Sequence, residues 1–419
     1  MSSRIGIREV APVTIYKQVS ELRLPDMARI EIEHQVADPE IQTRLTTLTV
    51  NSKRLEFPRR SLCLTKETHS ESHVVENPSI RGVNEIPRRV TKDLVLDIDN
   101  DEEKQERFYG DIASRFHSVN SADEINMFIF SYDNGPRDKD NPRKRGPNKT
   151  PTDTETEYLC GLLDHMFNDI WVPPIVRGLK ASEYLPYLQS FYDLAQSKRH
   201  VHVAGLIPRF GRLDIRRLTE LYTSHDINYL VMDFDERNPL ALIGSINMTK
   251  AIASAIEDRT GAPCFVHGIN VPFYRGLWED EILPARDILL FGFGFDCFGS
   301  SHVFRPWRPM DKTILEKIKN EPKRYRLFNR NDFGYHRDNT IKPREFEEQA
   351  PVSVTVSEVK NAGERRKTRL LESAFNAERH GLEVEVLRSK LRAGKRLGEY
   401  FAGKGQIPPS VLGRLYRQK

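Results

Sequence analysis

A chain of 419 residues can bury one large core and still carry an additional segment. The 38% hydrophobic and 30% charged residues, with no fully apolar run of roughly 20 residues, are typical of a water-soluble globular protein and argue against a membrane-spanning one. The net charge of +4 does not by itself indicate a nucleic-acid partner. The first residues, Met-Ser-Ser-Arg-Ile-Gly, lack the apolar stretch of a signal peptide, so we expect a cytoplasmic protein with no membrane partner.

The first 90 residues contain short strand-like pieces at Leu45–Val50 and Leu55–Phe57, which we expect either to complete the fold or to cover its mouth. From about Asp93 onward, apolar strands alternate with amphipathic helices. The predicted strands are Leu94–Ile98, Met127–Tyr132, Ile170–Val176, Val201–Ile207, Tyr229–Phe234, Cys264–Ile269 and Ile288–Phe295. The predicted helices are Glu102–Phe116, Glu155–Phe167, Ser182–Ser197, Asp214–Thr223 and Leu240–Arg259.

Near-continuous apolar strands are typical of a parallel sheet that is buried on both faces. Repeated strand–helix units, with one more strand from the first 90 residues, predict an α/β fold closed into a (β/α)8 TIM-type barrel. A doubly wound open sheet is the alternative, but no strand is followed by a GxGxxG turn. The expected organisation is an N-terminal segment (1–90), a barrel (91–345) and a small basic helical C-terminal region (346–419).

Two stretches of the chain are strongly basic. Lys360 to Lys419 holds 15 Lys and Arg against 6 Asp and Glu, and a second cluster runs from Arg137 to Lys149. Phosphate backbones bind such patches by releasing condensed counterions. A solvated protein surface explains either cluster equally well when it is taken alone.

The four cysteines are scattered and include no CxxC pair, which argues against a zinc knuckle, an iron–sulfur cluster and a disulfide framework. We expect reduced thiols.

Catalytic groups of a barrel lie at the carboxyl ends of its strands, and several acidic residues are predicted there. Asp133, Asp233, Asp235 and Asp296 each end a predicted strand, and another ends in His267, Gly268 and Asn270. An aspartate after a strand is also a common helix N-cap, and that alternative applies to Asp133 and Asp235. It applies less well to Asp296, because the glycines around it indicate a backbone that a ligand approaches closely.

Histidines offer a second kind of site. His200 and His202 form an HxH pair, and with His267 and Asp296 they would resemble the site of a metal-dependent amidohydrolase. In that family, however, the HxH belongs to the first barrel strand, whereas here it comes mid-chain. The simpler interpretation is that these histidines begin an ordinary strand.

Read in order, the strand-end segments resemble the tRNA-guanine transglycosylase superfamily. Gly294-Phe-Asp-Cys297 is similar to part of its Asp-Met-Phe-Asp-Cys stretch, Val203-Ala-Gly-Leu206 to its Val-Gln-Gly-Gly segment, and Ser131-Tyr-Asp-Asn-Gly135 to its Thr-Asp-Ser-Gly-Gly-Phe motif. The resemblance spans roughly residues 45 to 305. It departs from the family in lacking the CxCxxC zinc site and in replacing the glycines of the base-recognition turn with Met232–Glu236.

The resemblance implies an enzyme that exchanges guanine in nucleic acid for a free 7-deazaguanine base such as preQ0. The missing zinc site favours the DNA-modifying branch, with tRNA as the alternative substrate. Asp296 would be the nucleophile and Asp133 the general base, and neither a metal nor another cofactor is expected. The residues expected to bind the base are Asp233, Asp235, Gly205, Leu206, His267 and Gly268, and those expected to bind phosphates are Arg137, Arg143, Lys144, Arg145, Lys149 and Arg305. A metal-dependent hydrolase and a non-catalytic nucleic-acid-binding barrel remain alternatives.

Overall fold

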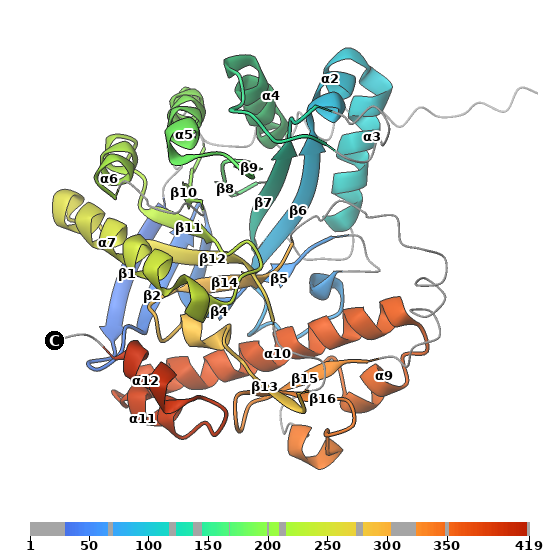
Figure 1. Ribbon diagram of the computed structural model, residues 1–419, viewed down its shortest axis with the longest axis vertical. Coiled ribbons are helices and arrows are strands. Elements are labelled where there is room, and N and C mark those ends of the chain that lie inside the picture. Colours follow the sequence, from blue (N-terminus) through green and yellow to red (C-terminus); the bar gives the residue numbers. More distant parts are fainter. Residues whose placement is uncertain are drawn as a thin grey trace, which may run out of the picture.

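The computed structural model describes residues 30–65, 70–116, 123–136, 145–166, 168–198, 201–208, 215–273, 280–302, 324–347 and 352–416. These residues form a mixed α/β fold in which parallel sheets are flanked by ten α-helices (Figure 1). The parallel strands are β4 (Arg59–Arg60), β5 (Leu62–Cys63), β6 (Val83–Thr91), β7 (Ile125–Asp133), β8 (Ile170–Trp171), β9 (Ile175–Val176), β10 (Gly205–Ile207), β11 (Tyr229–Asp233), β12 (Phe265–Val271) and β14 (Cys297–Ser300). The helices are α2 (Lys92–Asn100), α3 (Glu102–Ala113), α4 (Asp153–Asp164), α5 (Ala181–Gln196), α6 (Ile215–Ser224), α7 (Ile243–Thr260), α9 (Val356–Lys360), α10 (Arg365–Arg392), α11 (Leu397–Ala402) and α12 (Pro409–Leu415).

One short segment of chain joins the two parallel sheets. One sheet has the strand order β10-β11-β12-β14-β4, and the other has the order β5-β6-β7-β8, with β9 also paired to β7. A single residue, Ser61, separates β4 from β5, and its N–H donates to Phe298 O of β14 at 2.9 Å. At the opposite edges, Trp171 of β8 pairs in parallel with Val203, just before β10. All the strands therefore present their carboxyl ends on the same side.

Several strand and helix predictions are confirmed. The apolar runs at Met127–Tyr132, Tyr229–Phe234 and Cys264–Ile269 correspond to β7, β11 and β12, and α3 to α7 lie where helices are predicted. Helix α4 begins where its local sequence favours a helix start, because Thr152 and Glu155 form a capping box there.

Two strand predictions are wrong. The run Leu94–Ile98 lies in α2, where the Thr91 side chain accepts a hydrogen bond from Leu94 N and caps the helix. The run Ile288–Phe295 forms a short 3-10 helix, η5 (Ile288–Leu290), and a turn through Gly294 at φ +87°. Its side chains are apolar because nearly all of them are buried, so hydrophobicity alone did not indicate a strand there.

An antiparallel sheet of β1 (Ile30–Ala37), β2 (Arg44–Val50) and β3 (Lys53–Phe57) covers the amino ends of the parallel strands. Its side chains reach residues that directly precede those strands. Lys53 Nζ donates to Glu124 O before β7 and to Asp169 Oδ2 before β8, each at 2.7 Å, and Arg44 Nη2 donates to Cys264 O before β12 at 2.6 Å. Residues 30–57 thus cover the edge opposite the carboxyl ends, while residues 59–91 supply β4, β5 and β6.

The C-terminal region is helical, as predicted, and α10 is its longest element. It packs across β4 and across a second antiparallel sheet, which consists of β13 (Ile282–Pro284), β16 (Gly334–Arg337) and β15 (Arg326–Asn329). Near one end of α10, Ser373 Oγ donates to Glu71, which follows β5; near the other, Arg388 Nη1 donates to Glu56 O at 2.7 Å. The remaining short 3-10 segments are η2 (Glu71–His73), η3 (Ser114–Phe116), η4 (Pro239–Leu242) and η6 (Pro343–Phe346).

Within the described part of the chain, Pro239–Thr260 is long and apolar enough to cross a membrane by length and composition alone. Its side chains Ile246, Ile252 and Ile256 are buried in the core, as in a core helix of a soluble protein.

Candidate active site at the carboxyl ends of the strands

Acidic side chains gather where β11 and β12 end. Asp233, the last residue of β11, accepts hydrogen bonds on Oδ1 from Asn270 Nδ2 at 2.8 Å and from Asp235 N at 2.9 Å. Glu236 N donates to Asn270 O at 3.0 Å, and Ser301 Oγ donates to Glu236 Oε1 at 2.7 Å. Three carboxylates therefore lie in one hydrogen-bonded cluster, which we call the acidic edge (Asp233, Asp235, Glu236, Asn270).

The backbone of the acidic edge is strained. Asp235, Glu236 and Asn270 have φ values of +46°, +56° and +56°, in the left-handed region that side chains other than glycine seldom adopt. Each such residue costs on the order of 1 kcal/mol or more and persists only when its surroundings hold it there. Strain of this kind clusters at functional sites, so the conformation marks the acidic edge as a candidate site.

Asp133, at the end of β7, is connected to the acidic edge through polar contacts. Arg89 Nε lies 2.7 Å from Asp133 Oδ2. Asn148 Nδ2 lies 3.5 Å from Asp133 Oδ1 and donates to Arg177 O at 3.1 Å, and Arg177 Nε forms an ion pair with Asp235 Oδ1 at 3.1 Å. The structure thus links the predicted site residue Asp133 to Asp235 and Asp233 indirectly, through Asn148 and Arg177.

The carboxyl group of Asp233 differs from an ordinary aspartate. Burial raises its pKa above the usual value, although hydrogen bonds from Asn270 and from the Asp235 amide act in the opposite direction. A raised pKa lets a carboxyl group hold a proton closer to neutral pH, which suits a general acid or base.

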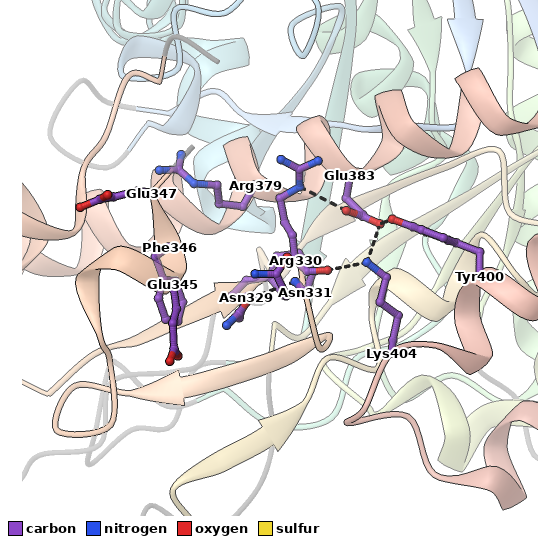
Figure 2. Close-up of a pocket in the computed structure, with 11 residues that line it drawn as sticks. Asn329, Arg330, Asn331, Glu345, Phe346, Glu347, Arg379, Glu383, Tyr400 and Lys404 are labelled. Carbon is purple, nitrogen blue, oxygen red and sulfur yellow. Dashed lines mark hydrogen bonds and ion pairs between the residues drawn. The ribbon is translucent and has the colours of Figure 1, made fainter. Parts of the chain in front are cut away.

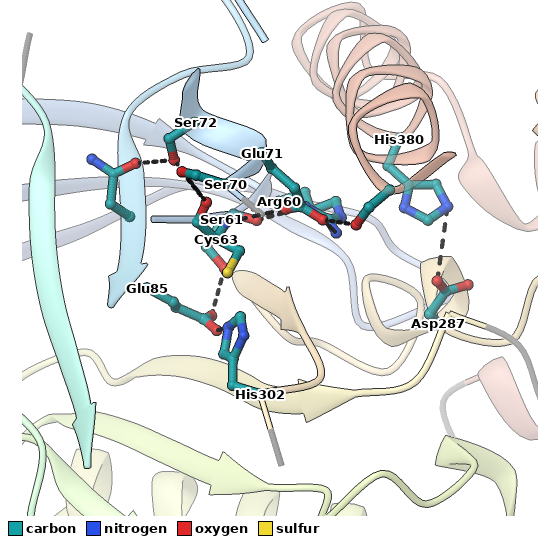
Figure 3. Close-up of polar contacts among 12 residues, drawn as sticks. Arg60, Ser61, Cys63, Ser70, Glu71, Ser72, Glu85, Asp287, His302 and His380 are labelled. Atoms are coloured by element: carbon teal, nitrogen blue, oxygen red, sulfur yellow. Dashed lines mark hydrogen bonds and ion pairs between the residues drawn. The ribbon is translucent and has the colours of Figure 1, made fainter. Parts of the chain in front are cut away.

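Beneath the acidic edge, a buried carboxylate lies between two imidazoles. Glu85 Oε1 is 2.7 Å from His267 Nε2, and Glu85 Oε2 is 2.7 Å from His302 Nε2. Ser61 Oγ donates to Glu85 Oε1 at 2.5 Å (Figure 3). A Cβ atom on Gly299 would lie 1.9 Å from Glu85 Oε1, so the carboxylate fills the space that a side chain at position 299 would need.

These buried groups stabilise one another in their charged forms. Burial raises the pKa of Glu85, but hydrogen bonds from His267 and His302 outweigh it and lower that pKa to about 2. Burial lowers the pKa of each histidine, yet Cys297 and Glu85 raise the pKa of His267 to about 10, and Cys63 and Glu85 do the same for His302. At neutral pH the cluster therefore holds a carboxylate between two imidazolium groups.

Sequence reasoning missed much of this site. His302 N donates to Asn270 Oδ1 at 2.9 Å, so the buried cluster and the acidic edge form one network. The functional candidates that the sequence did not reveal are Glu85, Arg89, Arg177, Glu236 and His302, whereas Asn270 was expected at the end of a strand. In the sequence, Gly299 stands out only as a neighbour of Asp296, and it is the one signal that another group approaches closely at this position.

Asp296 is not at the carboxyl edge, so the prediction that it ends a strand is wrong. It immediately precedes β14 and faces the β1–β3 sheet at the amino ends. Arg44 donates to both of its carboxylate oxygens, at 3.0 Å and 2.8 Å, while Thr46 Oγ1 donates at 2.8 Å and Val266 N at 2.9 Å. Its side chain has no exposed surface.

The predicted base-binding residues on β10 and β12 are tightly packed. Leu206 N donates to Tyr192 Oη at 3.0 Å and Leu206 O accepts from Tyr222 Oη at 2.5 Å, so helix tyrosines already engage both of its peptide groups. A Cβ atom on Gly205 would lie 3.0 Å from the side chain of Leu230 and 3.2 Å from that of Tyr222, so Gly205 is closely packed as well. A Cβ atom on Gly268 would lie 2.9 Å from the ring of Phe234, which explains the glycine by packing.

Of the residues predicted to bind phosphates, Arg137, Arg143, Lys144 and Arg305 lie outside the described residues. Arg145 forms an ion pair with Asp93 and donates to Gly135 O at 3.0 Å, which holds the chain after β7 in place. Lys149 is exposed. It lies near Asp133 because its backbone is hydrogen bonded to the side chain of Asn134, the next residue.

The histidines of the metal-site alternative are not shown together. His200 lies outside the described residues, and His202 Nε2 is 3.0 Å from Asn51 Oδ1, at the amino-end edge. Among the described residues, no group of three or more His, Cys, Asp or Glu side chains has a geometry that would hold a metal ion.

A cavity of about 190 Å³ lies in the C-terminal region, between α10 and the β13–β16–β15 sheet (Figure 2). Its central carboxylate, Glu383, already contacts the hydroxyl of Tyr400, Arg330 Nε at 3.2 Å and Lys404 Nζ at 3.3 Å. The charges of Glu383, Arg330 and Lys404, which Figure 2 shows next to one another, are thus paired among themselves. We therefore take the cavity to be structural.

Fold and site together define a mixed α/β protein with an acidic, strained cluster at the carboxyl ends of its parallel strands. No protein-family model matches the chain, and a search of curated proteins gives no match.

Proposed function

We propose that the two parallel sheets form a single closed (β/α)8 barrel and that the acidic edge is the active site of a cytoplasmic enzyme. The pairing of β14 with β4, of β5 with β6 and of Trp171 with Val203 supports this proposal, because it connects the sheets at both of their edges. Active sites of such barrels lie at the carboxyl ends of the strands.

We infer that the reaction is the exchange of guanine in nucleic acid, DNA in preference to tRNA, for a 7-deazaguanine base. One observation carries this inference: Asp133, which the family resemblance selects, lies in one connected polar network with Asp233 and Asp235, which the strand-end pattern selects. With Asp133 and Asp233 engaged in the chemistry, the two carboxylate oxygens of Asp235 can accept from the N1–H and exocyclic amine of a guanine-type base. The target nucleoside must leave its stack to reach them.

In the proposed mechanism, Asp133 is the nucleophile and Asp233 carries the proton. An oxygen of Asp133 forms a bond to C1′ of the sugar while the C1′–N9 bond breaks, and N9 of the departing guanine takes the proton of Asp233. Asp233 then removes the N9 proton of the incoming 7-deazaguanine. The deprotonated N9 attacks C1′ and releases the Asp133 carboxylate. The ion pair with Arg89 orients the Asp133 carboxylate for its attack on C1′ and receives the carboxylate again when the second step releases it.

This mechanism does not use Asp296. Four hydrogen bonds occupy its carboxylate at the amino-end edge, and an attack on a sugar would require breaking the ion pair with Arg44. We propose a structural role for Asp296 instead.

The test is release of radiolabelled guanine from duplex DNA and from bulk tRNA, with preQ0 as acceptor, by wild type, Asp133→Asn and Asp296→Asn. We expect release from DNA by the wild type, at least a roughly 100-fold loss in Asp133→Asn and retained exchange in whatever fraction of Asp296→Asn is folded. Release from tRNA alone would move the substrate to RNA.

Retained exchange in Asp133→Asn together with loss in folded Asp296→Asn would return the nucleophile to Asp296. Absence of release from either substrate by folded wild type, with nucleic acid still bound, would contradict the enzymatic proposal and favour a binding protein.

A further inference from the structure

Asn270 is the residue at which the acidic edge and the buried histidine cluster meet. Its side-chain oxygen Oδ1 accepts a hydrogen bond from His302 N at 2.9 Å, and its side-chain nitrogen Nδ2 donates to Asp233 Oδ1 at 2.8 Å. Its carbonyl oxygen accepts from Glu236 N at 3.0 Å. The side chain is buried, and both of its polar atoms have a partner of the matching kind.

The donor to Asn270 Oδ1 is fixed from beneath. His302 Nε2 lies 2.7 Å from Oε2 of the buried Glu85, which holds the end of β14 against β6 (Figure 3). Because a backbone N–H can only donate, His302 N prevents the Asn270 amide from turning over. The donor nitrogen of Asn270 must therefore point at Asp233.

Two donors converge on the same oxygen of Asp233. Its Oδ1 accepts from Asn270 Nδ2 and, at 2.9 Å, from Asp235 N. Neither nitrogen can accept a hydrogen bond, so a proton on Oδ1 would face two N–H groups. No described residue donates to the other oxygen, Oδ2. A proton carried by Asp233 therefore resides on Oδ2.

The groups that face Asp233 from neighbouring elements act on its charge in opposite directions. Burial raises the pKa of Asp233, and the charge of Asp235 does so too, whereas hydrogen bonds from Asn270 and the Asp235 amide and the charge of Arg177 lower it. Tyr184 on α5 stays neutral, because burial raises its pKa. Asn270 is thus the group that most strongly opposes the effect of burial on Asp233.

We propose that Asn270 is a positioning residue for the base exchange: it keeps the proton of Asp233 on Oδ2, the oxygen that gives this proton to N9 of the departing guanine. The O–H bond of Asp233 breaks as the N9–H bond forms, and the electron pair of the C1′–N9 bond goes to N9. The reverse transfer returns the proton of the incoming base to the same oxygen. This inference rests on the proposed base exchange and gives the buried Glu85–His302 pair a part in it.

A purely structural role of Asn270 would depend on its backbone alone. Its φ of +56° lies in the left-handed region, which asparagine tolerates better than most residues and which glycine adopts without strain. Glycine at this position keeps the backbone conformation and removes the amide. Asn270→Gly therefore separates the two roles, because it preserves a backbone role and abolishes a positioning role.

Asn51→Gly is the matched control. Asn51 has a φ of +55°, lies at the amino-end edge and contacts His202 rather than the acidic edge. Asn270→Asp is a second variant, which can still accept from His302 N but presents an oxygen in place of an N–H group to Asp233. Circular dichroism shows whether each variant is folded.

The first measurement is an NMR titration of the Asp233 carboxyl group, in full-length protein isotopically labelled at its aspartate carboxyl carbons and without nucleic acid. The signal that is missing in Asp233→Asn identifies this group. We expect its titration midpoint to rise by about one pH unit in Asn270→Gly, and by more in Asn270→Asp, where a carboxylate replaces the donor. Asn51→Gly should leave the midpoint unchanged. Equal midpoints in wild type and folded Asn270→Gly would overturn the proposal.

The second measurement is the pH profile of guanine release from DNA, with preQ0 as acceptor. In Asn270→Gly we expect kcat to fall by roughly 10-fold or more and KM to change by less than about twofold, because the amide acts on proton transfer and not on binding. The decline of kcat at high pH, where Asp233 loses its proton, should move to higher pH together with the titration midpoint. Asn51→Gly should retain the wild-type profile.

A wild-type kcat and an unchanged pH profile in Asn270→Gly would overturn the proposal and leave the base exchange in place. Absence of guanine release by the wild type would contradict the base exchange itself. The carboxyl titration needs no nucleic acid, so it would still decide whether Asn270 controls the proton of Asp233.

Discussion

Gly299 and Glu85 share one volume between β14 and β6, and this pair shows how a single residue sets the local chemistry. Because position 299 has no side chain, a carboxylate from the neighbouring part of the fold can enter and bind two histidines. Replacing the glycine would place a methyl group inside hydrogen-bonding distance of that carboxylate.

Gly299→Ala should therefore lower the free energy of unfolding by about 1–3 kcal/mol or more, because Glu85 must leave its partners. The measurement is urea denaturation followed by circular dichroism. Gly110→Ala in α3 is the matched control: nothing lies within 4 Å of its added Cβ, so it should stabilise the protein by about 0.5–1 kcal/mol. Equal effects of the two substitutions would contradict the crowding at position 299.

The Glu85–His267–His302 cluster also predicts a pH dependence of stability. The pKa values of both histidines are raised from 6.5 to about 10, so their contribution is complete below pH 6.5 and is lost as the pH rises towards 10. The pKa of Glu85 is lowered from 4.5 to about 2, so its contribution is complete above pH 4.5 and is lost as the pH falls towards 2.

Between pH 6.5 and about pH 10, the free energy of unfolding should thus decrease by up to about 1.4 kcal/mol per pH unit for each histidine. Urea titrations at several pH values measure this slope. His267→Gln should reduce it, and a slope identical to that of the wild type would show that His267 does not hold the extra proton.

Residue-level predictions succeeded where a strand was correctly placed. Asp133 and Asp233 end β7 and β11 as expected, because both strands are continuous apolar runs. Asp296 failed because its strand was placed too early in the chain.

At the scale of elements, β6 shows what a sequence pattern cannot reveal. Val83–Thr91 contains Glu85, Pro87 and two arginines, so it does not read as a strand, yet it pairs with β7 along its whole length. Its polar side chains bind partners on other strands, such as His267 and Asp133, that no local pattern identifies. Tertiary contacts override intrinsic preference here.

Asp296 is one of several residues that join the covering sheet β1–β3 to the parallel strands. Asp296→Ala leaves the Arg44 guanidinium, which is mostly buried, without its main partner, and we expect the free energy of unfolding to fall by about 3 kcal/mol. Glu33→Ala removes an exposed ion pair with Arg54 on the same sheet and should change stability by less than about 1 kcal/mol.

Chemical denaturation of both variants tests this comparison. A destabilisation by Asp296→Ala no larger than that by Glu33→Ala would show that the ion pair does not hold the covering sheet in place.

At the scale of the whole molecule, four cations of the basic C-terminal region gather at one end of α10. Arg365, Arg366, Lys367 and Arg369 are exposed at the start of α10, where the helix dipole disfavours cations. This end of α10 also lies near Glu71, which follows β5 at the carboxyl side. The position suits contact with the backbone of a nucleic acid that enters the proposed active site.

Replacing Arg366 and Lys367 with alanine should weaken DNA binding and reduce the slope of log K against log salt by about 0.9 for each phosphate that the protein no longer neutralises. Fluorescence anisotropy at salt concentrations from roughly 50 to 200 mM would provide both the affinity and the slope. Arg107→Ala on α3 removes an exposed cation elsewhere and should leave the slope unchanged. An unchanged slope in the double variant would place the phosphate-binding residues on another surface.

Helix α10 has a consequence for the order in which the chain folds during its synthesis. It covers β4 and the segment after β5, which are made early, but it is itself among the last parts to leave the ribosome. Until then, apolar side chains such as Leu62 and Ile80 have no cover from Phe375 and Leu382. The growing chain must therefore expose these apolar side chains, which favour aggregation, for most of its synthesis. They become buried only when the last helices have been made and have packed.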